Sequence, residues 1–425
     1  MAPRLFRRAG SIAAALALSG ALLAACAGLA QPSAPAANDP TSALQAGGVP
    51  AATHARPADA GAAPAATPNQ DQVEAGIQDA LDLYVKAYNE NDVDLLMRVV
   101  DQTNPPFRRY VRARFEDEQR SALGAGFSAK LKLASVTLRD LGLAQAHITY
   151  GGSAADWLFR QVGDRWVLAE PTPDQLGKPI VVRSEHFIFT TYQWADDVNG
   201  KLIEMMEQAR KNVAERLGQV PDTKAKVIIK PSYGLEPFED SFYLAVYIAH
   251  GDADAPDTIK IYAPHSYTFG FYNADAGWDA GLERVLTHEY THLVHRRSYD
   301  NAGHMAVWMS EGLAEFVAGD RHTYEMREAV RAGAIIPIVD SETPVYKQDL
   351  QHMNGLKVDQ GLAYGFAYTL VAYVDERYGG LPGFWKLARA YDKTQNLDKA
   401  LQQALGVGYA EFDRGWREWL AEKYG

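Results

Sequence analysis

The stretch Leu286-Thr287-His288-Glu289-Tyr290-Thr291-His292-Leu293-Val294 carries two histidines four positions apart, with a glutamate directly after the first. Residues four apart lie on the same face of an α-helix, so His288 and His292 can present two imidazoles to one ion. Glu289 is turned by about 100° from His288, so it flanks such an ion and can accept a proton. The stretch therefore predicts a helix that holds a metal ion beside a general base. It leaves one alternative open, a buried helix with two hydrogen-bonded histidines.

A candidate third ligand lies in the downstream stretch Val307-Trp308-Met309-Ser310-Glu311-Gly312-Leu313-Ala314-Glu315-Phe316, where eighteen residues separate His292 from Glu311. Catalytic zinc usually has three protein ligands and keeps a fourth position open for water. Two histidines and a carboxylate make such a donor set, which favours the metal site over the buried helix.

With this second stretch, W-x-x-E-G-x-A-E, the chain resembles the gluzincin metallopeptidases, especially their peptidase MA-like branch. The resemblance implies one zinc ion per chain, held by His288, His292 and Glu311, with Glu289 as the catalytic base. The metzincin pattern instead needs a glycine and a later histidine where this chain has His295 and Ser298. The metzincin interpretation is therefore excluded.

The residues around the two stretches suggest supporting roles. Turn-forming residues at Ser298–Gly303 predict a loop that lets a second helix, Val307–Val317, run back against the first. Glu315 lies one turn after Glu311 and could accept the N–H of a ligating histidine, or it could be a solvated surface acid. His295 shares the face of His288 and His292, but we expect it to be solvated or to cap the helix.

The gluzincin resemblance also implies a tyrosine, downstream of the third ligand, that donates a hydrogen bond to the oxyanion. Tyr364 stands in an Ala-Tyr-Gly setting near the start of an apolar, aromatic helix predicted at Gly361–Tyr378. The alternative is an aromatic stripe in the core. Three other histidines are possible donors, with nothing in the sequence to single one out: His265, His304 and His322.

The chain begins with a pattern typical of exported proteins. Three arginines precede the apolar run Ile12–Ala25, which is too short to span a bilayer and ends in small residues. Leu23-Ala24-Ala25-Cys26 resembles a bacterial lipobox, and Cys26 is the only cysteine. The resemblance implies that residues 1–25 are a signal peptide and that Cys26 is lipidated. The protein would then be extracytoplasmic and anchored to the cell envelope. An ordinary signal with an incidental cysteine is the alternative.

Composition limits the other classes of partner. Residues 26–70 are rich in Ala and Pro and almost lack large apolar side chains, so they predict a disordered tether. The formal net charge is −11, and no basic stripe is visible, which argues against a nucleic-acid partner. The sequence gives no indication of the oligomeric state.

The remaining length predicts two domains of an α+β protein. Residues 71–172 place helical patterns before strand patterns, including a hairpin at Gly163-Asp164. Together with Y-x-x-A-Y-N-x-x-D, this order resembles the NTF2-like (SnoaL-like) cone. That resemblance carries no catalytic motif, so we expect an accessory or partner-binding role.

Residues 180–425 are expected to form the peptidase domain, with a mixed sheet, the H-E-x-x-H helix and a helical C-terminal part. In gluzincin folds an edge strand before the zinc helix pairs with the substrate backbone. Thr258–Ala263 is the best-placed segment for this role, and an internal strand is the equal alternative. The stretch Pro264–Asn273 contains no acid to hold a free amine, and its aromatic residues suggest contacts with an extended peptide. We therefore expect an endopeptidase-like or narrowly specific site rather than a broad aminopeptidase. Asp275 and Asp279 are the nearest acids.

These observations predict hydrolysis of a peptide or protein substrate by zinc-activated water, with Glu289 as general base. Two alternatives remain: a catalytically inactive binding or scaffold lipoprotein, and a zinc hydrolase that acts on a non-peptide substrate.

Overall fold

The computed structural model describes residues 69–120, 127, 129–230, 245–248, 257–298, 305–319, 323–333, 335 and 360–425. The predicted signal peptide, Cys26, nearly all of the tether, His304 and His322 lie outside these residues, as does most of the predicted loop after Ser298. Helices and sheets are mixed along the chain, in agreement with the predicted α+β class.

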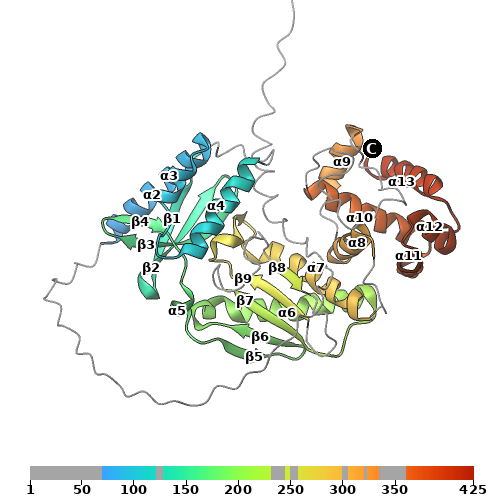
Figure 1. The fold of residues 1–425 in the computed structure, drawn as a ribbon, viewed down its shortest axis with the longest axis horizontal. Helices are drawn as coiled ribbons and strands as arrows, with labels where there is room; N and C mark the ends of the chain where they lie inside the picture. Colours follow the sequence, from blue (N-terminus) through green and yellow to red (C-terminus); the bar gives the residue numbers. More distant parts are fainter. Residues whose placement is uncertain are drawn as a thin grey trace, which may run out of the picture.

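The first part of the chain, here called the N-terminal unit, packs three helices against an antiparallel sheet (Figure 1). Its helices are α2 (Gln70–Glu90), α3 (Val93–Arg98) and α4 (Pro105–Arg120), and its strands are β1 (Lys132–Arg139), β2 (Leu143–Tyr150), β3 (Ser153–Val162) and β4 (Arg165–Leu168). Asn69 starts α2 with a capping box to Gln72, as expected for an asparagine at this position. The β3–β4 turn contains Gly163, whose φ of 66° suits glycine, so the predicted hairpin is present.

Helix α4 was not predicted from the sequence. Its buried residues Phe107, Tyr110, Val111 and Phe115 do recur at helical spacing. The many arginines and acids between them obscure this apolar stripe. The pattern was therefore present, but it was diluted by charge.

The second part of the chain, here called the C-terminal unit, contains a mixed sheet of order β5-β6-β7-β9-β8. The strands are β5 (Ile180–Arg183), β6 (Phe187–Thr191), β7 (Ala225–Lys230), β8 (Ala245–Ile248) and β9 (Thr258–Tyr262); β6, β7 and β9 are parallel, and β5 and β8 are antiparallel to their neighbours. Of the two alternatives for this segment, the edge strand is therefore wrong and the internal strand is confirmed, because β9 lies between β7 and β8 and is buried throughout. Among the described residues, the edge strand on that side is β8.

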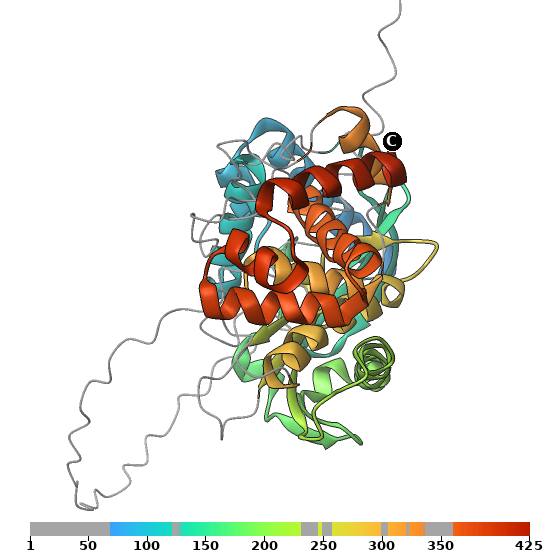
Figure 2. The same cartoon turned by 90° about the vertical axis from the view of Figure 1, so that its right-hand side faces the viewer.

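The helices of the C-terminal unit form two groups, α6 to α8 and the later helices α9 to α13. Helix α6 (Asp196–Leu217) packs on α7 (Asp279–Ser298), and α7 packs on α8 (Val307–Ala318). The later helices gather on one side of the molecule, which faces the viewer in Figure 2: α9 (Thr323–Arg331), α10 (Gln360–Arg377), α11 (Gly380–Thr394), α12 (Leu397–Leu405) and α13 (Tyr409–Tyr424). A short helix α5 (Pro173–Leu176) leads from the N-terminal unit into β5.

Two clusters of buried residues form the cores, one for each unit, and one segment contributes aromatic side chains to both. This segment lies between β9 and α7 and includes the one-turn helix η4 (Tyr267–Phe269) and strand β10 (Tyr272–Asn273). Its aromatic residues are buried, so the prediction that they contact an extended substrate is wrong. The aromatic side chains of the segment are divided between the two cores.

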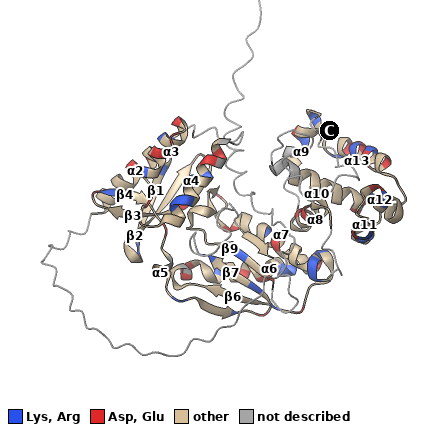
Figure 3. Ribbon diagram, viewed as in Figure 1, with Lys and Arg blue, Asp and Glu red and all other residues tan. Residues whose placement is uncertain are grey.

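Within the described residues, no helix is long and apolar enough to cross a bilayer. Lys and Arg are scattered among Asp and Glu on the helices of both units (Figure 3).

Candidate metal centre

Helix α7 is buried on most of its circumference around the H-E-x-x-H stretch, from Leu286 to His295. Its buried hydroxyls are satisfied within the helix, since Thr287 and Thr291 each donate to the carbonyl four residues earlier. Asn212 of α6 donates to Glu283 on one side, and α8 and β8 cover other sides. A helix held from several directions fixes the side chains that it presents.

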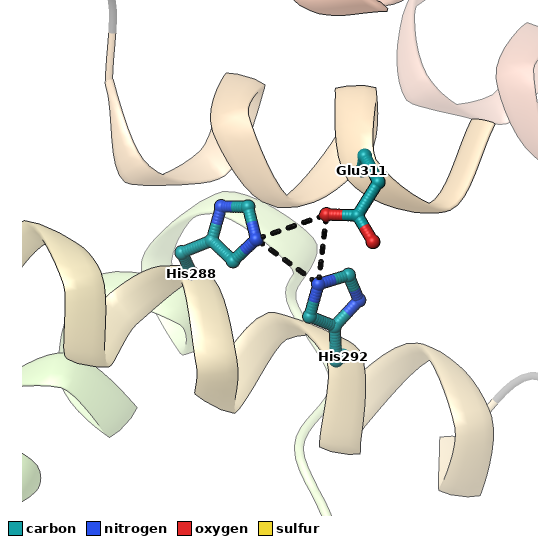
Figure 4. Close-up of side chains that lie close together, drawn as sticks. All are labelled: His288, His292 and Glu311. Carbon is teal, nitrogen blue, oxygen red and sulfur yellow. Dashed lines mark hydrogen bonds and ion pairs between the residues drawn. The ribbon is translucent and has the colours of Figure 1, made fainter. Parts of the chain in front are cut away.

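His288 and His292 point from α7 toward Glu311 on α8 (Figure 4). Their Nε2 atoms are 3.0 Å apart, and they lie 3.2 Å (His288) and 3.3 Å (His292) from Glu311 Oε2. All three residues are buried, and one ligand atom from each lies within 4.8 Å of the others. The two helices therefore bring the three sequence-predicted ligands together.

The donor chemistry of this cluster fits a zinc ion. Two imidazole nitrogens and one carboxylate oxygen are the ligand types of catalytic zinc sites. Burial alone would raise the pKa of Glu311, but the charge of His292 and hydrogen bonds from both histidines hold it below its usual value. Glu311 is thus a carboxylate, the form that binds a cation.

Glu315 holds the other side of His288. Its Oε1 lies 2.9 Å from His288 Nδ1, and its Oε2 accepts two hydrogen bonds from Arg284, of 3.0 Å and 2.9 Å. Glu315 is only 2% exposed, so it is not a solvated surface acid. Burial lowers the pKa of His288, but hydrogen bonds to Glu311 and Glu315 outweigh burial and raise the pKa to about 10.

His292 is held by a different pair of groups. Its Nδ1 lies 3.3 Å from His295 Nε2 and 3.2 Å from Ser310 Oγ, and the latter two atoms are 3.1 Å apart. The expectation that His295 is solvated or caps the helix is therefore wrong. The residue sits one turn after His292, under α8, and is 6% exposed. Burial, followed by the charge of His292, lowers the pKa of His295 to about 3, so it is neutral.

Glu289 points toward the edge strand of the sheet. Its Oε2 accepts a 2.8 Å hydrogen bond from the backbone N–H of Tyr247 in β8. The side chain is 1% exposed, which makes it a buried acid directly next to the ligand His288. This backbone contact was not predicted, because Tyr247 and Glu289 lie 42 residues apart along the chain.

Tyr364 of α10 packs beside the cluster, with its ring centroid 6.2 Å from that of His288 and the two planes at 67°. Its position depends on Gly312, the residue after Glu311. A Cβ at Gly312 would lie 2.3 Å from the carbonyl oxygen of Ala367, so only glycine allows α10 to approach α8 this closely. Gly312 stands in the W-x-x-E-G-x-A-E stretch, but its packing role was not predicted because it depends on α10. His265, another possible donor, lies elsewhere, at the contact between the two units.

Comparison with known proteins adds little to this geometry. No protein-family model matches the chain, and no curated protein matches it. The similar solved structures include an M1 zinc metallopeptidase from Deinococcus radiodurans, with 14% identity and a TM-score of 0.30 over 68% of this chain and 59% of that one. A mutant of an M1 zinc metallopeptidase from the same organism gives 13% identity and a TM-score of 0.30 over 69% of this chain and 60% of that one. The corresponding mutant bound to a Tyr-Ser-Ala substrate has 13% sequence identity and a TM-score of 0.29, over 68% of this chain and 59% of that one.

The chain thus spans about three fifths of the length of these metallopeptidases. A TM-score near 0.3 does not establish a shared activity.

Proposed function

We propose that this chain is a zinc metallopeptidase of the gluzincin type, peptidase MA-like in its second helix, that hydrolyses peptide bonds. One observation carries the proposal. The donor atoms of His288, His292 and Glu311 converge in a buried site, and Glu289, a buried acid, stands directly beside them on α7. Two imidazoles, one carboxylate and an adjacent acid are the parts that zinc-assisted hydrolysis needs.

Each residue then has a defined task. His288, His292 and Glu311 would hold one zinc ion, which supplies an activated water and polarises the scissile carbonyl. Glu289 accepts the proton of the attacking water and returns it to the leaving amine, which balances the hydrolysis. The N–H of Tyr247 orients the Glu289 carboxylate by binding one of its oxygens.

Two further residues complete the site. Glu315 accepts the Nδ1 proton of His288, so that Nε2 keeps its lone pair for the metal. Tyr364 is the proposed hydrogen-bond donor to the oxyanion, because its ring packs against His288. It lies on α10, which can approach α8 closely because residue 312 is glycine.

The proposed setting of the enzyme rests on the sequence alone. We propose an extracytoplasmic lipoprotein that is anchored to the envelope through Cys26 and acts on a peptide or protein substrate. The helices and antiparallel sheet of the N-terminal unit support the proposal of an NTF2-like domain. The endopeptidase preference suggested by the aromatic stretch is not proposed, because that stretch is buried between the two units.

The decisive experiment compares Glu289→Gln with the wild type. The purified protein is expected to contain one zinc per chain and to cleave members of a peptide panel. Glu289→Gln should retain the zinc and lose about 10²–10⁴-fold in kcat, because Gln is nearly isosteric but cannot accept the proton. Glu215→Gln, an exposed change on α6, is the matched control and should leave both quantities unchanged.

The same experiment separates the alternatives. Zinc binding without cleavage of any peptide would favour a scaffold or a hydrolase for another substrate. A Glu289→Gln variant with activity within a few-fold of wild type would contradict the assignment of the base.

A further inference from the structure

The segment between β9 and α7 alternates between the two cores of the protein. Tyr267 and Phe271 belong to the core of the N-terminal unit, whereas Phe269 and Tyr272 belong to that of the C-terminal unit. Only a few residues separate Asn273, the end of β10, from Asp279, the start of α7. Whatever holds this segment therefore acts close to the helix that carries His288 and His292.

The side chain of Tyr267 lies inside the N-terminal unit and is 1% exposed. Its hydroxyl bonds to that of Tyr84 on α2 at 2.7 Å. Its ring centroid lies 5.1 Å from that of Trp157 on β3 and 5.9 Å from that of Phe107 on α4. Helices and sheet of the unit therefore close around a residue that the later part of the chain supplies.

The backbone of the segment is held as well. Glu170, which is fully buried, accepts the N–H of Tyr267 at 2.8 Å and the hydroxyl of Ser266 at 3.1 Å. Arg114 of α4 donates to the carbonyl of Tyr267 at 3.2 Å, and its guanidinium lies 5.1 Å from the centre of the ring. A buried carboxylate that loses its donors is costly, so these contacts favour the docked segment strongly.

A strand pairing extends the same contact. Strand β10 joins β3 of the N-terminal sheet, with Tyr272 opposite Ala154 and Asn273 opposite Ser153. The hydroxyl of Tyr272 donates to Asp156 of β3 at 2.6 Å. Hydrogen bonds, aromatic packing and a cation–π contact thus converge on one short segment.

We propose that the N-terminal unit is an internal docking domain whose interior binds the segment Ser266–Tyr272 of the same chain. This binding fixes the position of the residues that lead into α7. Tyr267 is the anchor of this contact and acts as a positioning residue, since it reaches the candidate metal site only through the segment. The interior of the unit is accordingly a site for this chain's own tyrosine. This proposal concerns structure and does not depend on peptidase activity.

The test uses hydrogen exchange measured by mass spectrometry on the full chain. Tyr267→Ala should lower protection about tenfold or more in residues 265–273 and in the first turn of α7, as well as in α2 and α4. The matched control is Phe115→Ala, which removes a buried aromatic side chain of the same core from α4. It should lower protection in α2 and α4 but leave the segment and the start of α7 protected.

A chemical rescue distinguishes docking from general loss of stability. p-Cresol supplies the missing phenol ring and should restore protection to α2 and α4 of Tyr267→Ala, because an engineered apolar cavity can bind a small aromatic molecule. The ring is no longer joined to the chain, so residues 265–273 and the first turn of α7 should stay exposed to exchange.

Two results would overturn the proposal: unchanged protection of the segment in Tyr267→Ala, or full recovery of the segment with p-cresol. If Tyr267→Ala does not fold, Tyr267→Phe serves instead. It keeps the ring but removes the hydroxyl that bonds to Tyr84, and it should raise exchange severalfold in the same peptides. Unchanged exchange in Tyr267→Phe would then count against the proposal. A metal-free or inactive preparation gives the same readout, so failure here is separable from failure of the proposed activity.

Discussion

The two histidines of the candidate metal centre are oriented by different chemistry. His288 Nδ1 faces Glu315, whose charge is balanced by Arg284. His292 Nδ1 faces the neutral pair His295 and Ser310. A carboxylate partner raises the basicity of a ligating histidine more than a neutral acceptor does. We therefore expect zinc affinity to depend more on the partner of His288 than on the partners of His292.

This asymmetry gives a prediction for zinc affinity. Glu315→Gln keeps an acceptor for His288 but removes the charge that balances the partly buried Arg284. We expect zinc affinity to fall by about 10- to 100-fold, measured by competition with a chromophoric chelator. Circular dichroism checks that the variant is folded.

Two comparisons control that measurement. Ser310→Ala should weaken binding less, because His292 Nδ1 keeps its contact with His295. Glu328→Gln, on an exposed part of α9, should change nothing. An affinity for Glu315→Gln within twofold of wild type would refute the role of the carboxylate.

At the scale of elements, the close approach of α8 and α10 decides where Tyr364 lies. Gly312→Ala would force the two helices apart, because the added methyl group meets a backbone oxygen of α10. We expect a loss of about 1–3 kcal/mol in the free energy of unfolding. We also expect a lower kcat with zinc retained, because Tyr364 moves with α10 while the three ligands lie on α7 and α8.

Chemical denaturation and peptide kinetics on the same preparation measure both effects. Gly200→Ala in α6 is the matched control, because its added methyl group would meet open space and alanine favours a helix. That change should be neutral or slightly stabilising. If Gly312→Ala is also neutral, the close approach of α8 and α10 does not limit stability or the position of Tyr364.

A second element-scale feature is the buried His265 at the contact between β1, β3 and the start of α6. Its Nε2 has no hydrogen-bond partner among the described residues, and its ring packs edge-on against Trp194. Burial lowers the pKa of His265 to about 4, with Asp197 and Asp156 opposing and Arg139 reinforcing this shift. The histidine is therefore neutral in the folded protein at neutral pH.

The sign of the resulting pH dependence follows from proton binding. Between the unfolded pKa of 6.5 and the folded pKa of about 4, the unfolded chain binds a proton that the folded chain does not. The free energy of unfolding should thus fall by about 3 kcal/mol from this residue as the pH drops from 7 to 4. Denaturation of wild type and His265→Gln across this range isolates the contribution. Parallel curves for the two proteins would disprove it.

For the whole molecule, the segment shared by the two cores should make both units unfold together. Zinc binds only the folded site, so at a free concentration one hundred times Kd it should add about 2.7 kcal/mol to stability. We therefore expect calorimetry to show a single unfolding transition whose melting temperature falls when a chelator is added.

Glu311→Ala is the control for this effect, because it lacks the third ligand and should not respond to the chelator. Two separate transitions in the wild type, of which only one shifts, would show that the units are energetically independent.

The sequence by itself determined the local features of this protein. The spacing of His288 and His292 places them on one helical face whatever surrounds the helix, because the period of an α-helix is intrinsic to the backbone. Alternating and helical apolar patterns likewise located most strands and helices. The spacing of Phe107, Tyr110 and Phe115 contained the signal for α4 as well, but charged neighbours concealed it.

Only the tertiary structure decided the relations between distant segments. Glu315 is buried because Arg284 of another helix meets it, and His295 is buried because α8 covers it. The order of β8 and β9 follows from which strands pair, and the docking of Tyr267 in the N-terminal unit follows from a fit between segments more than a hundred residues apart. Burial and pairing depend on which surfaces meet in space, and a periodicity read along one segment carries no information about the segment that will cover it.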